Sequence, residues 1–191
     1  MRVILAGVLG GIVMFGWGAV SHMVLNIDAD VFKPIANEAA LAAAMKEHIP
    51  ADGMYFVPGM DMTRTPSDEE MAAFTAKYKE GPTAFIVYHQ TGGDLMGPMQ
   101  LGTQFAACLA TGLLGALILG LASVGFARGV IISFLIGLAA WVSMSIPYWN
   151  WYKFSWAFIR GELVDQVVGW LFAGLVMAFI LRRRDSGPTA L

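Results

Sequence analysis

The run LGTQFAACLATGLLGALILGLASVGFA, residues 101–127, contains no charged side chain and decides the class of fold. A helix needs about 20 mostly apolar residues to cross the hydrocarbon core of a bilayer. The backbone of such a run finds no hydrogen-bonding partner in lipid, so it must be helical there. The run therefore predicts a transmembrane helix, which we place at residues 99–127.

Three further apolar runs, 3–25, 130–147 and 163–181, accompany this one, and the last carries only Asp165 at one end. Of 191 residues, 57% are hydrophobic and 14% charged, whereas soluble domains carry about 25% charged residues. The mean hydropathy of +0.63 agrees. We expect a mainly α membrane protein, a four-helix transmembrane bundle whose other spans are 1–26, 129–147 and 163–182.

The arginines predict the orientation of these spans. Arg2, Arg128 and the three arginines at 182–184 all fall on one side if the spans alternate, and the positive-inside rule makes that side cytoplasmic. Both termini, including a tail at 183–191, are then cytoplasmic. Span 1 also resembles a signal peptide with a small-x-small site at 19–21, but its apolar run is long, so we expect an uncleaved anchor.

Residues 27–98 predict a small extracytoplasmic α/β domain inserted between spans 1 and 2. Asn37 is a candidate N-cap for one helix, and Ser67 with Glu70 forms a capping-box pattern that starts a second helix ending near Gly81. Strands are expected at 54–57 and 83–90. The order helix, strand, helix, strand favours two parallel strands with a right-handed crossover. Eleven acidic and five basic residues, a net charge of −6, argue against nucleic acid as a partner.

Residues 148–162 form an aromatic segment, in which we expect a short interfacial helix in the outer leaflet. Trp and Tyr gather at the headgroup level because each has an apolar body and a polar tip. A plain loop carrying an aromatic belt is the alternative. A quinone or lipid site here would use Trp149, Trp151 and Trp156.

Small residues recur at four-residue spacing in the predicted spans. Gly7 and Gly11 mark span 1, Ser133 and Gly137 mark span 3, and Gly112 marks span 2. Such positions let helix backbones approach closely in lipid. They predict tight packing between the spans.

Candidate metal ligands lie on the outer side of the predicted topology. The histidines are His22, His48 and His89, and paired methionines occur at Met60-x-Met62 and Met96-x-x-Met99. Thioethers with imidazole suit Cu(I), and the three histidines alone could form a zinc site. We predict no haem, because spans 2, 3 and 4 lack histidine and no Cys-x-x-Cys-His occurs.

Catalytic and transport signatures are weak in this sequence. No spacing specifies a nucleophile–base–orienter triad, a phosphate loop or HExxH, so we predict no catalytic residue and do not expect an enzyme. The deep parts of the spans carry no ionisable residue, and Glu162 and Asp165 fall at the outer mouth of span 4. This argues against a self-contained secondary transporter.

Two stretches, WGAVSHMVL at 17–25 and YFVPGMDM at 55–62, resemble a group of small bacterial inner-membrane proteins of the same overall plan. The resemblance covers the first third of the chain and implies no activity, cofactor or site. It implies a multi-pass protein of the bacterial inner membrane and links His22 with the Pro58-Gly59-Met60 turn in one shared feature.

The leading functional hypothesis is a non-enzymatic membrane protein with a structural or accessory role. Its partners would be membrane lipid and either other membrane proteins, as a subunit of a larger complex, or further copies of itself. Extracytoplasmic copper handling by the methionines and histidines is the alternative. Binding of a lipid or quinone at the aromatic segment is the third hypothesis.

Overall fold

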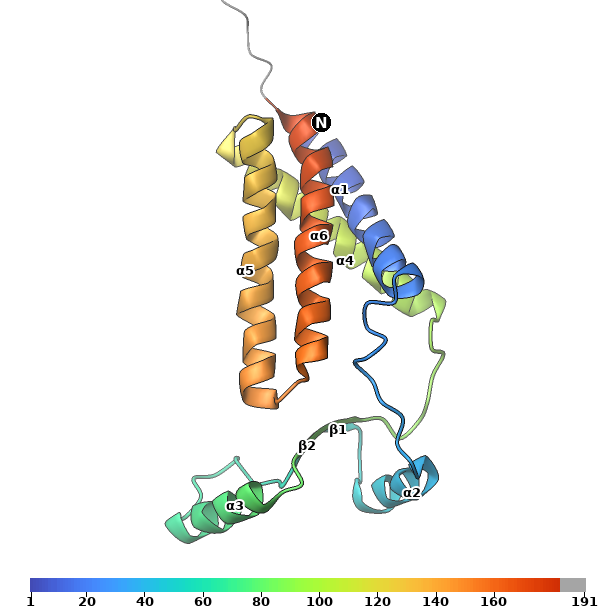
Figure 1. Cartoon of the computed structure of the whole chain (residues 1–191), viewed down its shortest axis with the longest axis vertical. Helices are drawn as coiled ribbons and strands as arrows, with labels where there is room; N and C mark the ends of the chain where they lie inside the picture. The colour runs from blue at the N-terminus through green and yellow to red at the C-terminus, as the bar shows by residue number, and fades with distance from the viewer. Residues whose placement is uncertain (183–191) are drawn as a thin grey trace, which may run out of the picture. The chain divides into compact units, whose positions relative to one another are not determined.

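The computed structural model describes residues 1–182, and the predicted cytoplasmic tail at 183–191 lies outside the described residues. The chain is mainly helical (Figure 1). Four helices are long and apolar enough to cross a membrane: Arg2–Val24, Pro98–Ala122, Phe126–Tyr152 and Trp156–Leu181. The predicted number of spans is therefore supported by both length and composition.

The chain divides into two compact units, and each is described by itself. The helical unit comprises residues 1–33 and 96–182, and the second unit comprises Pro34–Leu95. Residues 27–33, which we assigned to the outer domain, are thus grouped with the helices.

The helical unit contains α1 (Arg2–Ala19), a π-helical turn η1 (Val20–Val24), α4 (Pro98–Ala122), α5 (Phe126–Tyr152) and α6 (Trp156–Leu181). The main packing pairs are α1 with α4, α1 with α6, and α5 with α6 (Figure 1). A core of small and large apolar side chains lies where these pairs meet: Ala6, Ala116, Leu119, Trp170, Ala173 and Met177.

Glycines allow α1 and α4 to touch backbone to backbone. A Cβ added to Gly7 would lie 2.7 Å from the Cα of Leu113, and one on Gly11 would lie 2.7 Å from the Cα of Leu109. Both distances are far below a carbon–carbon contact of about 3.5–4.0 Å. The small-residue prediction for span 1 is confirmed.

Small residues also let α5 and α6 pack closely. A Cβ on Gly174 would collide with the Ser133 side chain, and one on Gly137 would lie 2.8 Å from the Cβ of Trp170. Ser133 is fully buried, and its hydroxyl donates to a backbone carbonyl oxygen of its own helix over 3.0 Å. The small residues predicted in span 3, Ser133 and Gly137, therefore lie in a helix–helix interface.

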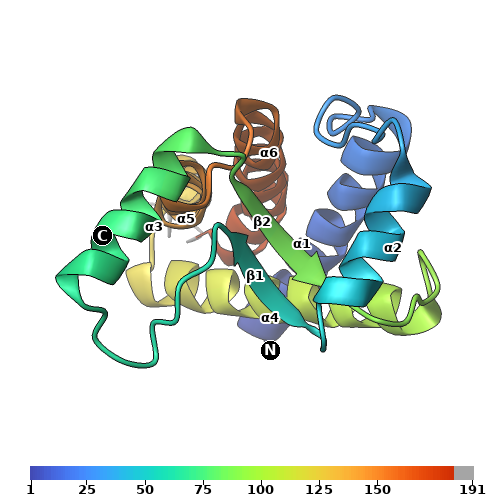
Figure 2. The same cartoon turned by 90° about the horizontal axis from the view of Figure 1, so that it is seen from below.

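The second unit contains α2 (Glu38–His48), β1 (Gly53–Val57), α3 (Asp68–Glu80) and β2 (Ala84–Tyr88). The prediction of parallel strands is wrong, because β1 pairs antiparallel with β2, with Tyr55 opposite Ile86. Figure 2 shows the two strands side by side, with α2 and α3 toward opposite ends of the sheet. The crossover rule assumes a connecting helix that packs on the sheet, and α3 does not cover it in this way.

The predicted helix caps in the second unit are confirmed. The Asn37 side chain accepts from the N–H of Ala40. Ser67 and Glu70 exchange both hydrogen bonds of a capping box, and Gly81 ends α3 with φ 73°. These contacts are local, so the sequence pattern specifies them directly.

The aromatic segment does not form the separate short helix that we expected. Instead, α5 continues through Pro147 to Tyr152, and α6 begins at Trp156 after a three-residue turn. Lys153 takes φ 60° at this turn. The prediction of a separate helix failed because the apolar and aromatic residues extend both α5 and α6. The left-handed conformation of Lys153 ends α5.

Candidate functional site

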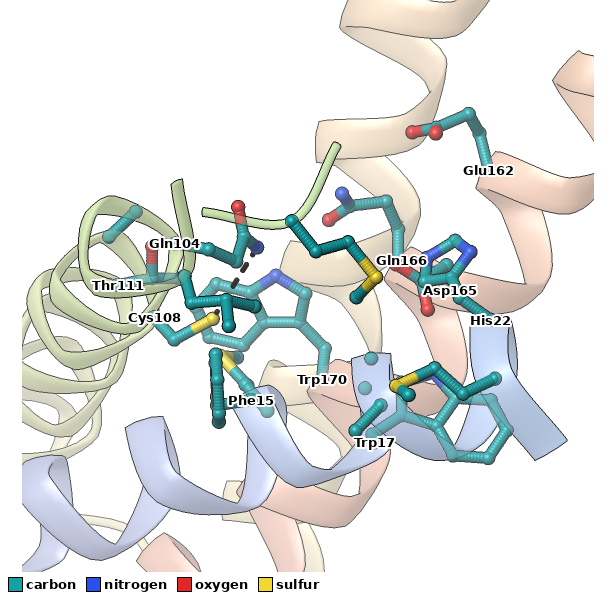
Figure 3. Close-up of a pocket in the computed structure, with 18 residues that line it drawn as sticks. Phe15, Trp17, His22, Gln104, Cys108, Thr111, Glu162, Asp165, Gln166 and Trp170 are labelled. Atoms are coloured by element: carbon teal, nitrogen blue, oxygen red, sulfur yellow. Dashed lines mark hydrogen bonds and ion pairs between the residues drawn. The ribbon is translucent and has the colours of Figure 1, made fainter. Parts of the chain in front are cut away.

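A cavity of about 570 Å³ opens in the helical unit between α1, α4 and α6 (Figure 3). It lies toward the end of the unit where α1 ends and α4 and α6 begin. Ligand pockets in proteins commonly have volumes of about 300–1,000 Å³ with mostly apolar walls and a few polar groups. This cavity has that size and character.

The π-helical turn η1, which follows α1, places His22 at the cavity. Its wider winding is shown by the Leu25 N–H, which donates to the Val20 carbonyl oxygen five residues back over 2.9 Å. Such π turns occur frequently at functional sites. Asn26 then takes φ 52° and reverses the chain, so that Asp28 returns to His22.

His22 lies between two carboxylates. Its Nδ1 is 2.5 Å from Asp28 Oδ2, and its Nε2 is 3.5 Å from Asp165 Oδ2. The Asp28 carboxylate reaches α6 because Gly161 has no side chain: a Cβ there would lie 2.6 Å from Asp28 Oδ1. The imidazole therefore links the loop that carries Asp28 to α6, which carries Asp165.

Asp165 is held by Ser21 from the neighbouring helix. The Ser21 hydroxyl donates to Asp165 Oδ1 over 2.7 Å, and Ser21 is 0% exposed. Hydrogen bonds to an ionised acceptor are among the stronger ones in proteins. This contact fixes α1 against α6 at the mouth of the cavity.

Glu162 also lines the cavity, one helical turn before Asp165. Its side chain is partly buried, and among residues 1–182 its carboxylate makes no hydrogen bond or ion pair. The mouth therefore carries three carboxylates and a single imidazole.

The α4 wall presents Gln104, Cys108 and Thr111, which share one helix face. The Gln104 amide nitrogen lies 3.7 Å from the Cys108 sulfur, a weak contact. The amide therefore remains available to another acceptor in the cavity.

Two indole rings line the cavity and present N–H donors. The Trp17 indole nitrogen is buried and has no hydrogen-bond partner among the described residues. Trp170 is 7% exposed, and its ring forms part of the cavity wall (Figure 3). The hydrogen bonds made within residues 1–182 include none from the Trp170 indole. A buried donor without a partner is rare in native proteins, and the Trp17 nitrogen is too enclosed for a group in the cavity to reach it.

The predicted metal ligands are divided between the two units. His22 and Met96 line the cavity, whereas Met99 is 84% exposed in the first turn of α4. Among residues 1–182, no group of three or more His, Cys, Asp or Glu side chains is arranged to hold a metal ion.

The remaining candidate ligands belong to the second unit. His48 ends α2, and Met60 and Met62 follow β1. His89 Nδ1 lies 3.2 Å from Asp52 Oδ2. The pKa of Asp52 is lowered, first by the Gln90 backbone N–H that its carboxylate accepts and then by His89.

The aromatic candidates lie where α5 ends and α6 begins. Trp149 and Trp156 meet edge to face at 6.5 Å, and Trp151 is 73% exposed. None of the three lines the cavity described above.

Sequence reasoning missed most of this cavity. The signal that was available is helical spacing: Trp17 and Ser21 are four residues apart, as are Gln104 and Cys108, and each pair shares a helix face. Trp170 carried no signal, because a tryptophan in an apolar span is indistinguishable from a lipid-facing one.

The chain matches no protein-family model. Neither a curated protein nor a solved structure is detectably similar to it.

Proposed function

We propose that this chain is a non-enzymatic integral membrane protein that binds an amphipathic ligand of the lipid or quinone class in the cavity between α1, α4 and α6. The observation that supports this most is the cavity itself, about 570 Å³ in volume, with aromatic and aliphatic walls and the polar side chains of Gln104, Glu162 and Asp165 in its lining. The proposed ligand places a polar head near these side chains and an apolar part against the surrounding wall.

The proposed orientation places the arginine-bearing end of the helical unit in the cytoplasm. Arg2 donates to the backbone carbonyl oxygens of Ile180 and Arg182, which brings the start of α1 to the end of α6. Arg128 and Arg182 border one cavity of about 480 Å³ at the same end. Gathered positive charge of this kind supports a cytoplasmic location of that end in a bacterial inner membrane, with the ligand cavity toward the opposite leaflet.

A cavity-filling variant with a matched control tests ligand binding. Ala107 lines the cavity, whereas Ala110 on the same helix is exposed and does not. The full chain is purified in mild detergent, its lipid and quinone content is measured by mass spectrometry, and binding of an added ubiquinone analogue and a lysophospholipid is titrated. We expect Ala107→Trp to lose the bound ligand and Ala110→Trp to retain it.

Two results would contradict the proposal. One is a wild-type protein that retains no lipid or quinone above the level of a control membrane protein and binds neither probe. The other is retention that is equal in the two tryptophan variants, because the ligand would then lie elsewhere.

The accessory role is part of the same proposal. We propose that the protein presents its bound ligand to a partner, which is either another membrane protein or a second copy of this chain. Mild-detergent purification from the native host, with identification of every co-purifying chain, tests this. A lone monomer would contradict the accessory role while leaving ligand binding intact.

Copper handling is a second candidate function, but with its ligands in the cavity and not in the outer loops. His22, Met23, Met96 and Cys108 all line it, and thioether, thiolate and imidazole groups suit Cu(I). Elemental analysis after Cu(I) loading decides this candidate. Copper below stoichiometry, or stoichiometric copper unchanged in Met96→Leu, would exclude this site.

A further inference from the structure

The mouth of the cavity carries an excess of negative charge. The two nitrogens of His22 face Asp28 and Asp165 at 2.5 and 3.5 Å, and Glu162 lines the same cavity one helical turn before Asp165. Even with His22 protonated, three carboxylates leave this group with a net charge of −2. The nearby Arg160 does not offset it, because its guanidinium is paired with Asp30 over 2.8 Å.

Such a charge excess favours a bound cation. Asp165 and Glu162 are both partly buried on α6, and charge in a partly desolvated site is costly unless an opposite charge accompanies it. Glu162 is the group to which such a cation has open access, since its carboxylate has no hydrogen bond or ion pair within residues 1–182.

The walls behind these carboxylates point to an organic cation. The aromatic rings of Phe15, Trp17 and Trp170 line the cavity behind the acidic mouth, and such rings bury the apolar part of an organic ligand. A metal ion would instead need several converging ligands, and no such group of His, Cys, Asp or Glu occurs in residues 1–182.

We propose that the ligand is an amphiphile whose head carries a protonated amine, bound with the ammonium at Glu162 and Asp165 and the apolar chain along the indole-lined wall. This inference rests on the proposed function and narrows it, because a quinone has no cationic group. An aminophospholipid carries both an ammonium group and an apolar acyl chain, so one molecule suits both the carboxylates and the apolar wall.

A pair of lysolipids with one acyl chain and different heads tests the inference. Lysophosphatidylethanolamine carries the amine, and lysophosphatidylglycerol has the same phosphate without it. Binding to the delipidated full-length protein is titrated by native mass spectrometry. We expect the wild type to prefer the amine lipid about tenfold, the gain of roughly one hydrogen bond to a charged group.

Two substitutions that each remove one negative charge test whether the lipid preference depends on the cavity or on the overall charge of the protein. In Glu162→Gln we expect the preference for the amine lipid over the glycerol lipid to fall to about threefold or less. The amide keeps the shape of the side chain and loses its charge. Asp68→Asn removes the same charge from the first turn of α3 in the second unit, outside the cavity wall, and it is expected to keep the preference.

A change on the ligand makes the test independent of protein folding. Acetylating the amine of lysophosphatidylethanolamine is expected to reduce its binding to the wild type to the level of the glycerol lipid. Equal binding of the amine, acetylated and glycerol lipids would overturn the inference while leaving the proposed function standing. An amine preference that survives Glu162→Gln would also overturn it. If none of the three lipids bound the wild type and Ala107→Trp did not change the amount of bound ligand, both the inference and the proposed function would be overturned.

Discussion

Replacing Gly11 by alanine tests whether backbone contact between α1 and α4 holds the helical unit together. The added Cβ would lie 2.7 Å from both the Cys108 carbonyl oxygen and the Leu109 Cα. A relaxed carbon–carbon contact is about 3.5–4.0 Å, so the two helices must separate by about 1 Å. Neither atom can rotate away, because both belong to the α4 backbone.

The expected cost follows from that separation. A gap of about 0.5–1 Å forfeits roughly a quarter to a half of each dispersion contact, and overpacked cores lose about 1–3 kcal/mol. We therefore expect Gly11→Ala to lower the free energy of unfolding by about 1–3 kcal/mol. Alanine is the better helix former by about 1 kcal/mol, so the loss of packing must exceed that gain for the sign to hold.

Gly16 provides the matched control on the same helix. A Cβ there meets nothing within 4 Å, so Gly16→Ala adds the same methyl group without a clash and is expected to be neutral or slightly stabilising. Both variants are unfolded by titrating sodium dodecyl sulfate into mixed micelles, with helicity followed by circular dichroism. If Gly11→Ala proved as stable as Gly16→Ala, the inferred backbone contact would be refuted.

Three further outcomes are expected. Ser21→Ala removes the 2.7 Å donor to Asp165 and should lower the free energy of unfolding in micelles by about 1.5–3 kcal/mol; no change would mean that the carboxylate does not depend on it. Trp141→Phe loses an indole hydrogen bond of 2.9 Å to a backbone carbonyl oxygen of α6 and should cost about 0.5–1.5 kcal/mol, visible as a lower Tm. Arg64 lowers the pKa of Glu70 from 4.5 to about 2. A depressed folded-state pKa stabilises above the unfolded value, so the advantage of wild type over Glu70→Gln should be complete above pH 4.5 and decline toward pH 2. A pH-independent difference in thermal unfolding would contradict it.

Features that depend on neighbouring residues could be predicted. The apolar runs marked four long helices, and the capping box of Ser67 and Glu70 appeared as the pattern indicated. The glycine positions of α1 also pointed to close helix contact, although the pattern could not name α4 as the partner. The direction of β2 could not be predicted, because it depends on how α3 returns the chain.

The candidate site was visible only in part. His22 and Met96 were chosen for their chemistry and do line the cavity, whereas Met60 and His89 belong to the second unit. Ser21 and Asp165, which hold the mouth together, are 144 residues apart. No local pattern carries information over that separation.

The sequence by itself determined the membrane class, the number of long apolar helices and the caps of α2 and α3, because hydrophobic length and capping chemistry are local properties. Only the tertiary structure decided which helix faces meet. The close approach at Gly161 and the turn at Asn26 bring Asp28 to His22, and the same packing gathers the indoles and carboxylates around one cavity. A site assembled from three helices exists only once their interfaces are set, and steric fit between backbones sets them.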